Sequence, residues 1–281
     1  MSRFYVEDPH WVGNKIEISG AEVRHIQKVL RLKKGDEIVL FDGKGMEYWG
    51  AIESQKLNRI TVTIEKTNTP RRESPIEVIL GQGLLKGDKM DYVLQKTTEM
   101  GVSAIFPFLS SRTVPNVGGE RLERRWNRWK RIAVESAKQC GRTVPPKVEA
   151  VRDLTSILEW PVGDLVKLIL WEKEEMSLRE SIAGIDKKSR RFLFLVGPEG
   201  GFCEREVSAA KGNGFIPVGL GPRILRSETV GVAMLSILQY EFGDWRPPHQ
   251  RAKREDSPEV LRGVKGGGRY KGKARDHGDT E

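Results

Sequence analysis

Two patterns of hydrophobic and polar positions divide the chain. Up to about residue 69, short segments alternate apolar with polar residues, which is typical of strands that bury one face. The predicted strands span residues 3–6, 15–18, 37–41, 48–53 and 59–65. One helix is predicted over residues 20–31, with Val23, Ile26, Val29 and Leu30 at helical spacing. This set of elements predicts a small β-barrel.

A polar segment bounded by Pro70 and Pro75 precedes the second pattern. Here segments that are apolar throughout alternate with helical stretches. The predicted strands are 76–80, 104–109, 165–171, 192–196 and 215–218, and the helices are 86–100, 120–139, 177–183, 204–213 and 228–242. Such strands predict a parallel sheet with helices on both faces. We therefore expect an α/β protein with domains at residues 1–70 and 71–246, followed by a disordered basic tail at 247–281.

Composition narrows the class of protein. Hydrophobic residues make up 38% of the chain and charged residues 31%, as in globular domains. No apolar run reaches the roughly 20 residues that cross a bilayer, and we expect no secretory signal at the N-terminus. Two cysteines make a disulfide framework improbable, which favours a cytoplasmic location. The net charge of +9, only part of which lies in the tail, favours a polyanionic partner.

Three strand ends carry the candidate binding residues, because ligands of α/β domains bind beyond the carboxyl ends of parallel strands. The sequence Gly-Pro-Glu-Gly-Gly follows the fourth strand, and glycines let a backbone approach a nucleotide closely. A second glycine-rich segment starts at Gly219 and contains Arg223 and Arg226. Ser227 then suggests the N-cap of the last helix. The third junction, at Trp171, has no glycine.

Other chemistries lack their motifs. Residues 81–87 read GxGxxxG, one residue longer than the dinucleotide fingerprint, and no acidic residue closes a second strand at the expected distance. The sequence therefore does not favour a nicotinamide-dependent oxidoreductase. No phosphate-binding GxxxxGK[ST] loop and no GxSxG elbow occur. The four histidines show no ligand spacing, so we expect no metal site.

Four segments resemble the RsmE family, bacterial 16S ribosomal RNA uridine-N3 methyltransferases of the SPOUT superfamily. They read HIQKVLRLKKGDEIVLFDG (25–43), KGDKMDYVLQKTTEMGV (86–102), FLVGPEGGFCEREV (194–207) and GLGPRILRSETVGVAML (219–235). The resemblance extends to about Trp245. It implies a SPOUT trefoil-knot domain, an N-terminal PUA-like RNA-binding barrel, a homodimer in which the last helix supplies contact, and a 16S rRNA substrate, expected on the assembled 30S subunit.

The resemblance also implies that S-adenosylmethionine is gripped by the loops at 170–172, 197–201 and 220–225. The predicted cofactor-binding residues are Leu170, Trp171, Glu172, Gly197, Glu199, Gly200, Gly201, Gly219, Leu220, Ile224, Leu225 and Thr229. We expect Arg226 to be catalytic, because a fixed positive charge would stabilise the anion that develops on the uracil oxygens. Glu199 could instead orient the substrate or cap a helix, and no residue stands out as the general base.

Basic residues are the candidates for RNA contact. On the barrel these are Arg3, Arg24 and Arg31, with Lys33 and Lys34 nearby. The helix at 120–139 has an apolar stripe formed by Leu122, Trp126, Trp129, Ala133, Ser136 and Ala137. Its other faces carry Arg121, Arg124, Arg125, Arg128 and Arg131. We expect both tryptophans to belong to the core and the arginines to favour RNA.

Two alternatives remain open from the sequence. One keeps the SPOUT fold but changes the target to a ribose 2′-hydroxyl or a guanosine of another RNA. The other is a non-catalytic RNA-binding factor in ribosome assembly that retains the pocket without turnover.

Overall fold

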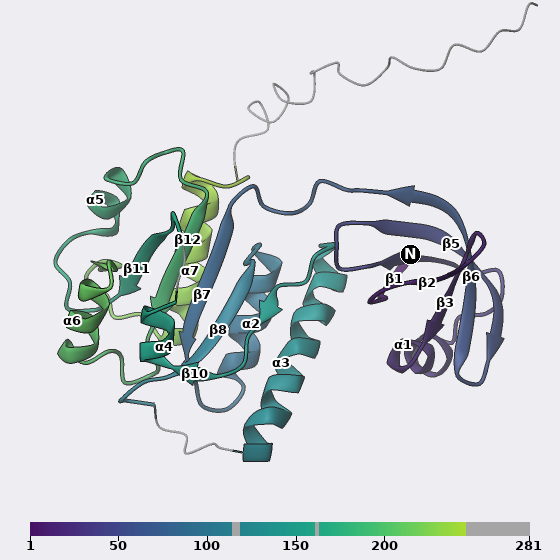
Figure 1. Ribbon diagram of the computed structural model, residues 1–281, viewed down its shortest axis with the longest axis horizontal. Helices are drawn as coiled ribbons and strands as arrows, with labels where there is room; N and C mark the ends of the chain where they lie inside the picture. Colours follow the sequence, from purple (N-terminus) through teal and green to yellow (C-terminus); the bar gives the residue numbers. More distant parts are fainter. Residues whose placement is uncertain (114–118, 161–162, 246–281) are drawn as a thin grey trace, which may run out of the picture. The chain divides into compact units, whose positions relative to one another are not determined.

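The computed structural model describes residues 1–113, 119–160 and 163–245. Two sheets, one on each side of the linker at residues 69–75, organise this part of the chain (Figure 1). The predicted tail at 247–281 lies outside the described residues. The domain limits at residues 70 and 246 stay predictions.

The N-terminal sheet contains six strands in the order β1-β4-β5-β6-β3-β2. Their bounds are β1 Ser2–Tyr5, β2 His10–Val12, β3 Lys15–Ser19, β4 Glu37–Phe41, β5 Glu47–Lys56 and β6 Arg59–Asn68. All neighbours are antiparallel except β1 and β4. The five predicted strands are present within a few residues of their expected ends. The sequence analysis missed β2, whose three residues are all exposed and show no alternation.

The predicted helix at 20–31 is present over residues 21–29, with a different winding in its second half. It consists of α1 (Ala21–Arg24) followed by η1 (His25–Val29), which has π-helical winding. Val23 and Ile26 are buried as expected, but Val29 and Leu30 are exposed. The wider π turn, in which Leu30 N–H donates to the His25 carbonyl, rotates these two residues away from the core face.

The C-terminal sheet is parallel throughout, as predicted, with the order β10-β8-β7-β12-β11-β13 and β9 paired to β8. Its strands are β7 Glu77–Gly83, β8 Ala104–Leu109, β9 Lys147–Val148, β10 Arg152–Asp153, β11 Val166–Leu170, β12 Arg191–Val196 and β13 Ile216–Val218. The helices are α2 Lys89–Glu99, α3 Gly119–Cys140, α4 Leu154–Leu158, α5 Leu178–Ala183, α6 Glu204–Gly212 and α7 Ser227–Glu241. The short elements β9, β10 and α4 were not predicted. The trefoil knot stays a prediction.

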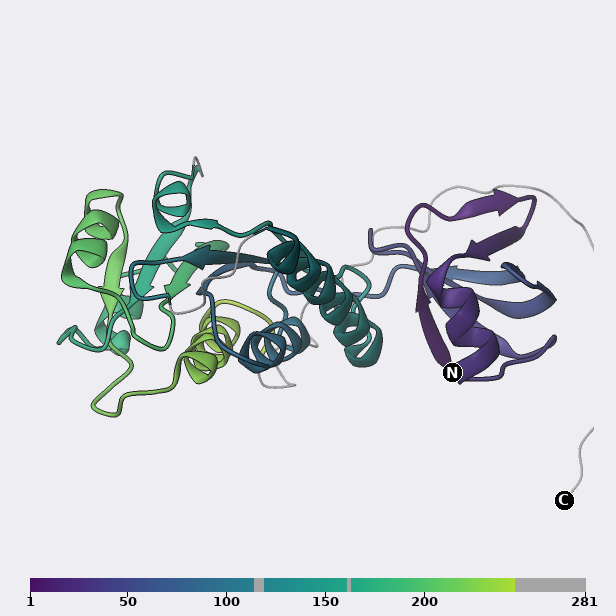
Figure 2. The same ribbon diagram turned by 90° about the horizontal axis from the view of Figure 1, so that it is seen from below.

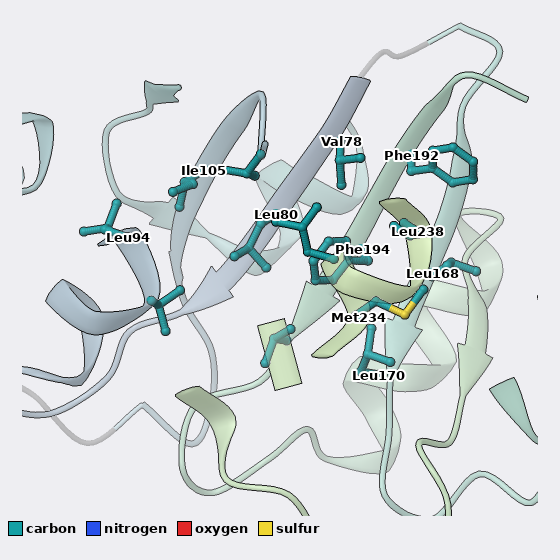
Figure 3. Close-up of a cluster of buried hydrophobic side chains, with 14 of the residues drawn as sticks. Val78, Leu80, Leu94, Ile105, Leu168, Leu170, Phe192, Phe194, Met234 and Leu238 are labelled. Carbon is teal, nitrogen blue, oxygen red and sulfur yellow. The ribbon is translucent and has the colours of Figure 1, made fainter. Parts of the chain in front are cut away.

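Helices cover both faces of this sheet (Figure 2). Val78 and Leu80 of β7 pack in a core shared with α2, α3, α5 and α7, whereas Ile79 between them packs in a second core with α4 and α6. Figure 3 shows the first core, where Met234 and Leu238 of α7 lie over the strands. This alternation explains why the strand sequences are apolar at every position: both faces are buried.

Helix α3 buries the stripe that the sequence predicts. Trp129, Ala133 and Ala137 are fully buried, and Leu122 and Trp126 pack against the same core. The indole N–H of Trp126 donates to the Val148 carbonyl at 2.9 Å. Both tryptophans of the stripe are therefore core residues, as expected.

Candidate functional site

A cavity of about 490 Å³ lies beyond the carboxyl ends of β11, β12 and β13. Its walls contain Lys89, Leu170, Trp171, Glu172, Val196, Gly197, Pro198, Glu199, Gly200, Gly201, Val218, Leu220, Gly221, Pro222, Arg223, Ile224, Leu225, Arg226, Ser227, Glu228 and Val230. The three strand ends chosen from the sequence thus meet around one cavity. Among the predicted cofactor residues, Gly219 and Thr229 are not part of the lining.

Gly219 is required by packing rather than by a ligand. A Cβ at this position would lie 2.6 Å from the carbonyl oxygen of Glu174, so no side chain fits there. Its amide donates to the Met176 carbonyl at 3.3 Å. Thr229 is exposed in the first turn of α7, and its amide donates to the Arg226 carbonyl.

Ser227, at the start of α7, connects the loop at 197–201 to strand β7 through hydrogen bonds. The prediction that it is the N-cap of α7 is wrong: Arg226 is the N-cap residue, and Ser227 is the first helical residue. Its hydroxyl donates to the Gly197 carbonyl and accepts a hydrogen bond from Gln82 Nε2 at 3.1 Å. A serine at this position would cap the helix only if its side chain turned back to the helix amides, but the hydroxyl is held by Gly197 and Gln82 instead.

The glycines at 81 and 83 lie inside β7, not in a loop. A Cβ on Gly83 would be 2.5 Å from the Pro198 nitrogen, because the loop at 197–201 crosses directly over the end of β7. The amide of Gly201, which has a positive φ of 66°, donates to the Pro198 carbonyl and closes this loop tightly. Arg112 holds the loop from its outer side by donating to the Gly200 carbonyl at 2.9 Å.

Two carboxylates meet one lysine at the cavity wall. Lys89 Nζ lies 3.2 Å from Glu199 Oε1 and 3.8 Å from Glu228 Oε2. Glu199 also accepts a hydrogen bond from the Lys86 amide at 3.0 Å. Burial raises the pKa of Glu199, but these hydrogen bonds and the charge of Lys89 outweigh it, so that the pKa lies below its usual value. Glu199 therefore stays ionised, and it accepts hydrogen bonds from the Lys86 amide and from Lys89 Nζ.

The sequence analysis missed Lys89 and Glu228 as site residues. Glu228 lies within the predicted segment, between Arg226 and Thr229, but was interpreted only as part of a helix start. Lys89 begins α2, far from the glycine-rich loops in sequence, and comes to the cavity only because β7 lies next to β12. No local pattern could have revealed it.

Three buried polar atoms around the cavity have no hydrogen-bond partner within the described ranges. They are Trp171 Nε1, Gln82 Oε1 and Glu228 Oε2. Unpaired buried polar groups are costly, and they are commonly explained by an ion, a water or a ligand. Trp171 and Glu228 lie on the cavity wall itself. Two residues of the cavity wall thus carry one unused donor and one unused acceptor, both buried behind the surface of the cavity.

Arg226 lies at this wall and is exposed. In the part of the chain that the structure describes, its guanidinium forms no hydrogen bond or ion pair. Ile224, in the same loop, is 84% exposed. An arginine without a fixed partner at a cavity that also offers backbone amides can bind an anionic group.

The predicted RNA-binding arginines fall into two groups. Arg24 and Arg31 are exposed. Arg3 is 14% exposed and forms an ion pair with the fully buried Glu47. It also donates to the carbonyls of Gly141 and Arg142, at 3.3 and 3.2 Å. Its hydrogen bonds are thus made within the protein, and Arg24 and Arg31 are the better candidates for RNA contact.

The arginines of α3 also fall into two groups, those with partners inside the protein and those that are exposed. Arg128 pairs with Asp91 at 2.7 Å, and Arg125 donates to the Leu85 carbonyl and lies over the ring of Trp129. Arg121 and Arg131 are exposed. The basic face predicted for α3 is therefore narrower than the sequence suggests.

Over residues 1–113, 119–160 and 163–245, no group of three or more His, Cys, Asp or Glu side chains has the arrangement of a metal site. In the same part of the chain, no helix combines the length and apolar character that a bilayer crossing requires.

Comparison with known proteins places this architecture in a class. Residues 72–239 match the family model of an RNA methyltransferase domain, and residues 18–65 match that of an RNA methyltransferase PUA domain. The fold and the cavity thus define an RNA methyltransferase with an accessory PUA domain.

Individual relatives agree. Ribosomal RNA small subunit methyltransferase E of Bacillus subtilis is 33% identical over 229 residues, which cover 80% of this chain and 89% of the relative. The crystal structure of ribosomal RNA small subunit methyltransferase E from Neisseria gonorrhoeae, bound to S-adenosyl methionine, is 34% identical with a TM-score of 0.80, covering 88% of this chain and 100% of that one. A putative methyltransferase from Legionella pneumophila in complex with the same cofactor is 31% identical with a TM-score of 0.80, covering 86% and 98%. The chain belongs to the family of ribosomal RNA small subunit methyltransferase E, the RsmE family.

Proposed function

We propose that this protein transfers a methyl group from S-adenosylmethionine to N3 of a specific uridine in 16S ribosomal RNA, on the assembled 30S subunit and in the cytoplasm. The observation that carries the proposal is the single cavity formed by three strand-end loops, with Arg226 at its wall, in a chain of the RsmE family. The 30S target and the uridine N3 position are what membership of this family leads us to expect.

The residues around the cavity fit S-adenosylmethionine. Leu170, Val196, Val218 and Leu220 give an apolar wall suited to an adenine ring. The loops at 197–201 and 220–225 present backbone groups, and Trp171 Nε1 is a buried donor that lacks a partner. We assign cofactor binding to these loops. When bound, the cofactor supplies a methyl group activated by its sulfonium sulfur.

The protein's own contribution is to hold the uracil and to favour loss of its N3 proton. We assign Arg226 to the uracil oxygens, where its charge would stabilise the developing anion. Holding the two reacting groups together supplies much of the remaining rate.

RNA contact is assigned to exposed basic residues of both domains. Arg24 and Arg31 belong to the segment from α1 to β4, and Arg121 and Arg131 to α3. Contacts of this kind neutralise phosphates and position the RNA without reading its sequence.

A homodimer is part of the proposal. Val230, Ala233, Ile237 and Tyr240 are spaced as one stripe of α7. Tyr240 is exposed and the other three are partly exposed, although Val230 and Ile237 also pack against the edge of the protein's own core. A partly exposed apolar stripe on a helix can pair with the same stripe of a second copy, as two-fold symmetry requires.

Binding and activity measurements separate this proposal from its alternatives. We expect calorimetry to detect S-adenosylmethionine binding, and labelled cofactor to methylate 30S subunits more rapidly than naked 16S RNA. Cofactor binding without methylation of either RNA would favour the alternative of a non-catalytic RNA-binding factor in ribosome assembly. Absence of cofactor binding would refute the enzyme proposal.

A further inference from the structure

Three carboxylates line the cavity, and one of them is placed to accept the proton that uridine N3 must lose. They are Glu172, Glu199 and Glu228. N3 of uracil carries a hydrogen, so its electron pair becomes available for methyl transfer only when that proton leaves. A positioned carboxylate can accept it if the carboxylate is ionised, close and not already saturated by hydrogen bonds.

Glu199 and Glu172 are poor acceptors. Glu199 already receives hydrogen bonds from the Lys86 amide and from Lys89, and its pKa is lowered, which weakens it as a base. Glu172 is exposed, and its oxygens lie against the backbone of Gly201. An exposed carboxylate is hydrated and lacks the fixed position that proton transfer in a closed complex needs.

Glu228 has the required features. It lies in the first turn of α7, two residues after Arg226, and its side chain is 15% exposed. Its Oε2 is buried and accepts no hydrogen bond within the described ranges. Lys89 Nζ, 3.8 Å away, is beyond hydrogen-bond distance, but its charge attracts the carboxylate and limits its movement. Glu228 thus lines the same cavity as Arg226 and carries a buried acceptor with an unused lone pair, which a small rotation of its side chain would turn toward the substrate.

We propose that Glu228 is the general base of the methyl transfer. The N3–H proton moves to Oε2 of Glu228, and the electron pair left on N3 forms the new bond to the methyl carbon. The bond between that carbon and the sulfonium sulfur breaks at the same time, and its electron pair stays on sulfur. This inference rests on the proposed uridine-N3 activity.

The surrounding charges support this division of roles. The charged side chains that line the cavity with Glu228 are Lys89, Glu172, Glu199, Arg223 and Arg226. Lys89 pairs with Glu199 as well as with Glu228, so Glu199 neutralises much of the charge of the lysine. Lys89 therefore holds Glu228 in place without occupying all of its hydrogen-bond acceptor sites. Arg226 would attract the uracil anion as the proton leaves, and Glu228 becomes neutral in the same step, so no two like charges remain together.

The experiment is a pH profile of single-turnover methyl transfer to 30S subunits by the wild-type protein and by Glu228→Gln. The amide has the shape of the carboxylate but cannot accept the proton. We expect the rate of Glu228→Gln near neutral pH to fall by about 100- to 10,000-fold. We expect the logarithm of its rate to rise by about one per pH unit, because N3 must then lose its proton to solvent hydroxide, whereas the wild-type rate levels off.

Three readouts keep this test independent of folding and of the proposed function. Calorimetry should give Glu228→Gln the wild-type affinity for S-adenosylmethionine within about threefold, and Glu228→Asp should recover part of the rate with a wild-type pH profile. Glu204→Gln, on the exposed start of α6, is the matched control and should behave as wild type.

A Glu228→Gln profile with the wild-type shape, or a rate loss matched by an equal loss of cofactor affinity, would overturn the assignment. If the wild-type protein itself forms no 3-methyluridine, the proposed function fails instead.

Discussion

Replacement of Ser227 by alanine tests how the cavity is held together. The Ser227 hydroxyl lies at the junction of β7, the loop at 197–201 and the start of α7, where it donates to the Gly197 carbonyl and accepts from Gln82 Nε2. Gln82 is fully buried and Gly197 is buried, so water replaces the lost hydroxyl poorly at these partners. Gln82 Nε2 keeps one hydrogen bond, to the Gly83 carbonyl at 3.1 Å.

The expected cost follows from the two hydrogen bonds. Leaving a buried partner unsatisfied costs about 1–3 kcal/mol per group. Because Gln82 retains one partner, the Gly197 carbonyl contributes most, and we expect Ser227→Ala to lower the free energy of unfolding by about 2–3 kcal/mol. We also expect the loop at 197–201 to lose its fixed position, which would weaken S-adenosylmethionine binding about tenfold or more.

Urea unfolding and calorimetry with S-adenosylmethionine measure these two effects. The matched control is Ser208→Ala, because Ser208 is exposed on α6, and its stability should change by less than about 0.5 kcal/mol. If Ser227→Ala has the same urea midpoint of unfolding as Ser208→Ala and binds the cofactor like the wild type, the hydroxyl does not stabilise the cavity and the reasoning is refuted.

Three further predictions concern separate parts of the molecule. Arg226→Ala should lower single-turnover methylation by about 100-fold or more while calorimetry shows nearly unchanged cofactor affinity; an equal loss of affinity would place Arg226 in the cofactor site. In Gly83→Ala the new Cβ would lie 2.5 Å from the Pro198 nitrogen, so cofactor affinity should fall and the free energy of unfolding should drop by about 1–3 kcal/mol. The control is Gly212→Ala, whose new Cβ has no atom within 4 Å; calorimetry and urea unfolding should show its affinity and stability unchanged. Burial and the hydrogen bond to Asp42 raise the pKa of Tyr48 from 10.0 to about 12, so its folded state favours the protonated phenol. The resulting stability, about 3 kcal/mol at most, is present below pH 10 and lost between pH 10 and about 12; thermal melts of Tyr48→Phe should lack this loss.

The sequence predicts most of the C-terminal fold because its strands are buried on both faces. Such strands are apolar at every position, and the pattern changes sharply at each helix. The short elements β9, β10 and α4 escape prediction, since two to five residues carry no period and Arg152 and Asp153 of β10 are exposed. At the N-terminus, the period of an α-helix was assigned to residues that wind as a π turn, so the helical spacing of Val29 and Leu30 gave no sign that they are exposed.

The site was partly predictable for a general physical reason. Parallel strands end at one edge of the sheet, so loops following β11, β12 and β13 had to meet there. Contacts between distant segments could not be read in the same way. Nothing near Arg3 indicates that Glu47 will pair with it, and nothing near Ser227 indicates that Gly197 will hold its hydroxyl. Side-chain roles of this kind depend on which segments the topology brings together.

Nucleoside analysis of methylated RNA tests the central claim most directly. The protein is incubated with 30S subunits and S-adenosylmethionine, and the 16S RNA is then digested to nucleosides and separated by chromatography with mass detection. The account predicts that 3-methyluridine appears, and that it does not appear with Arg226→Ala. Methylated ribose or methylated guanosine in place of 3-methyluridine would contradict it.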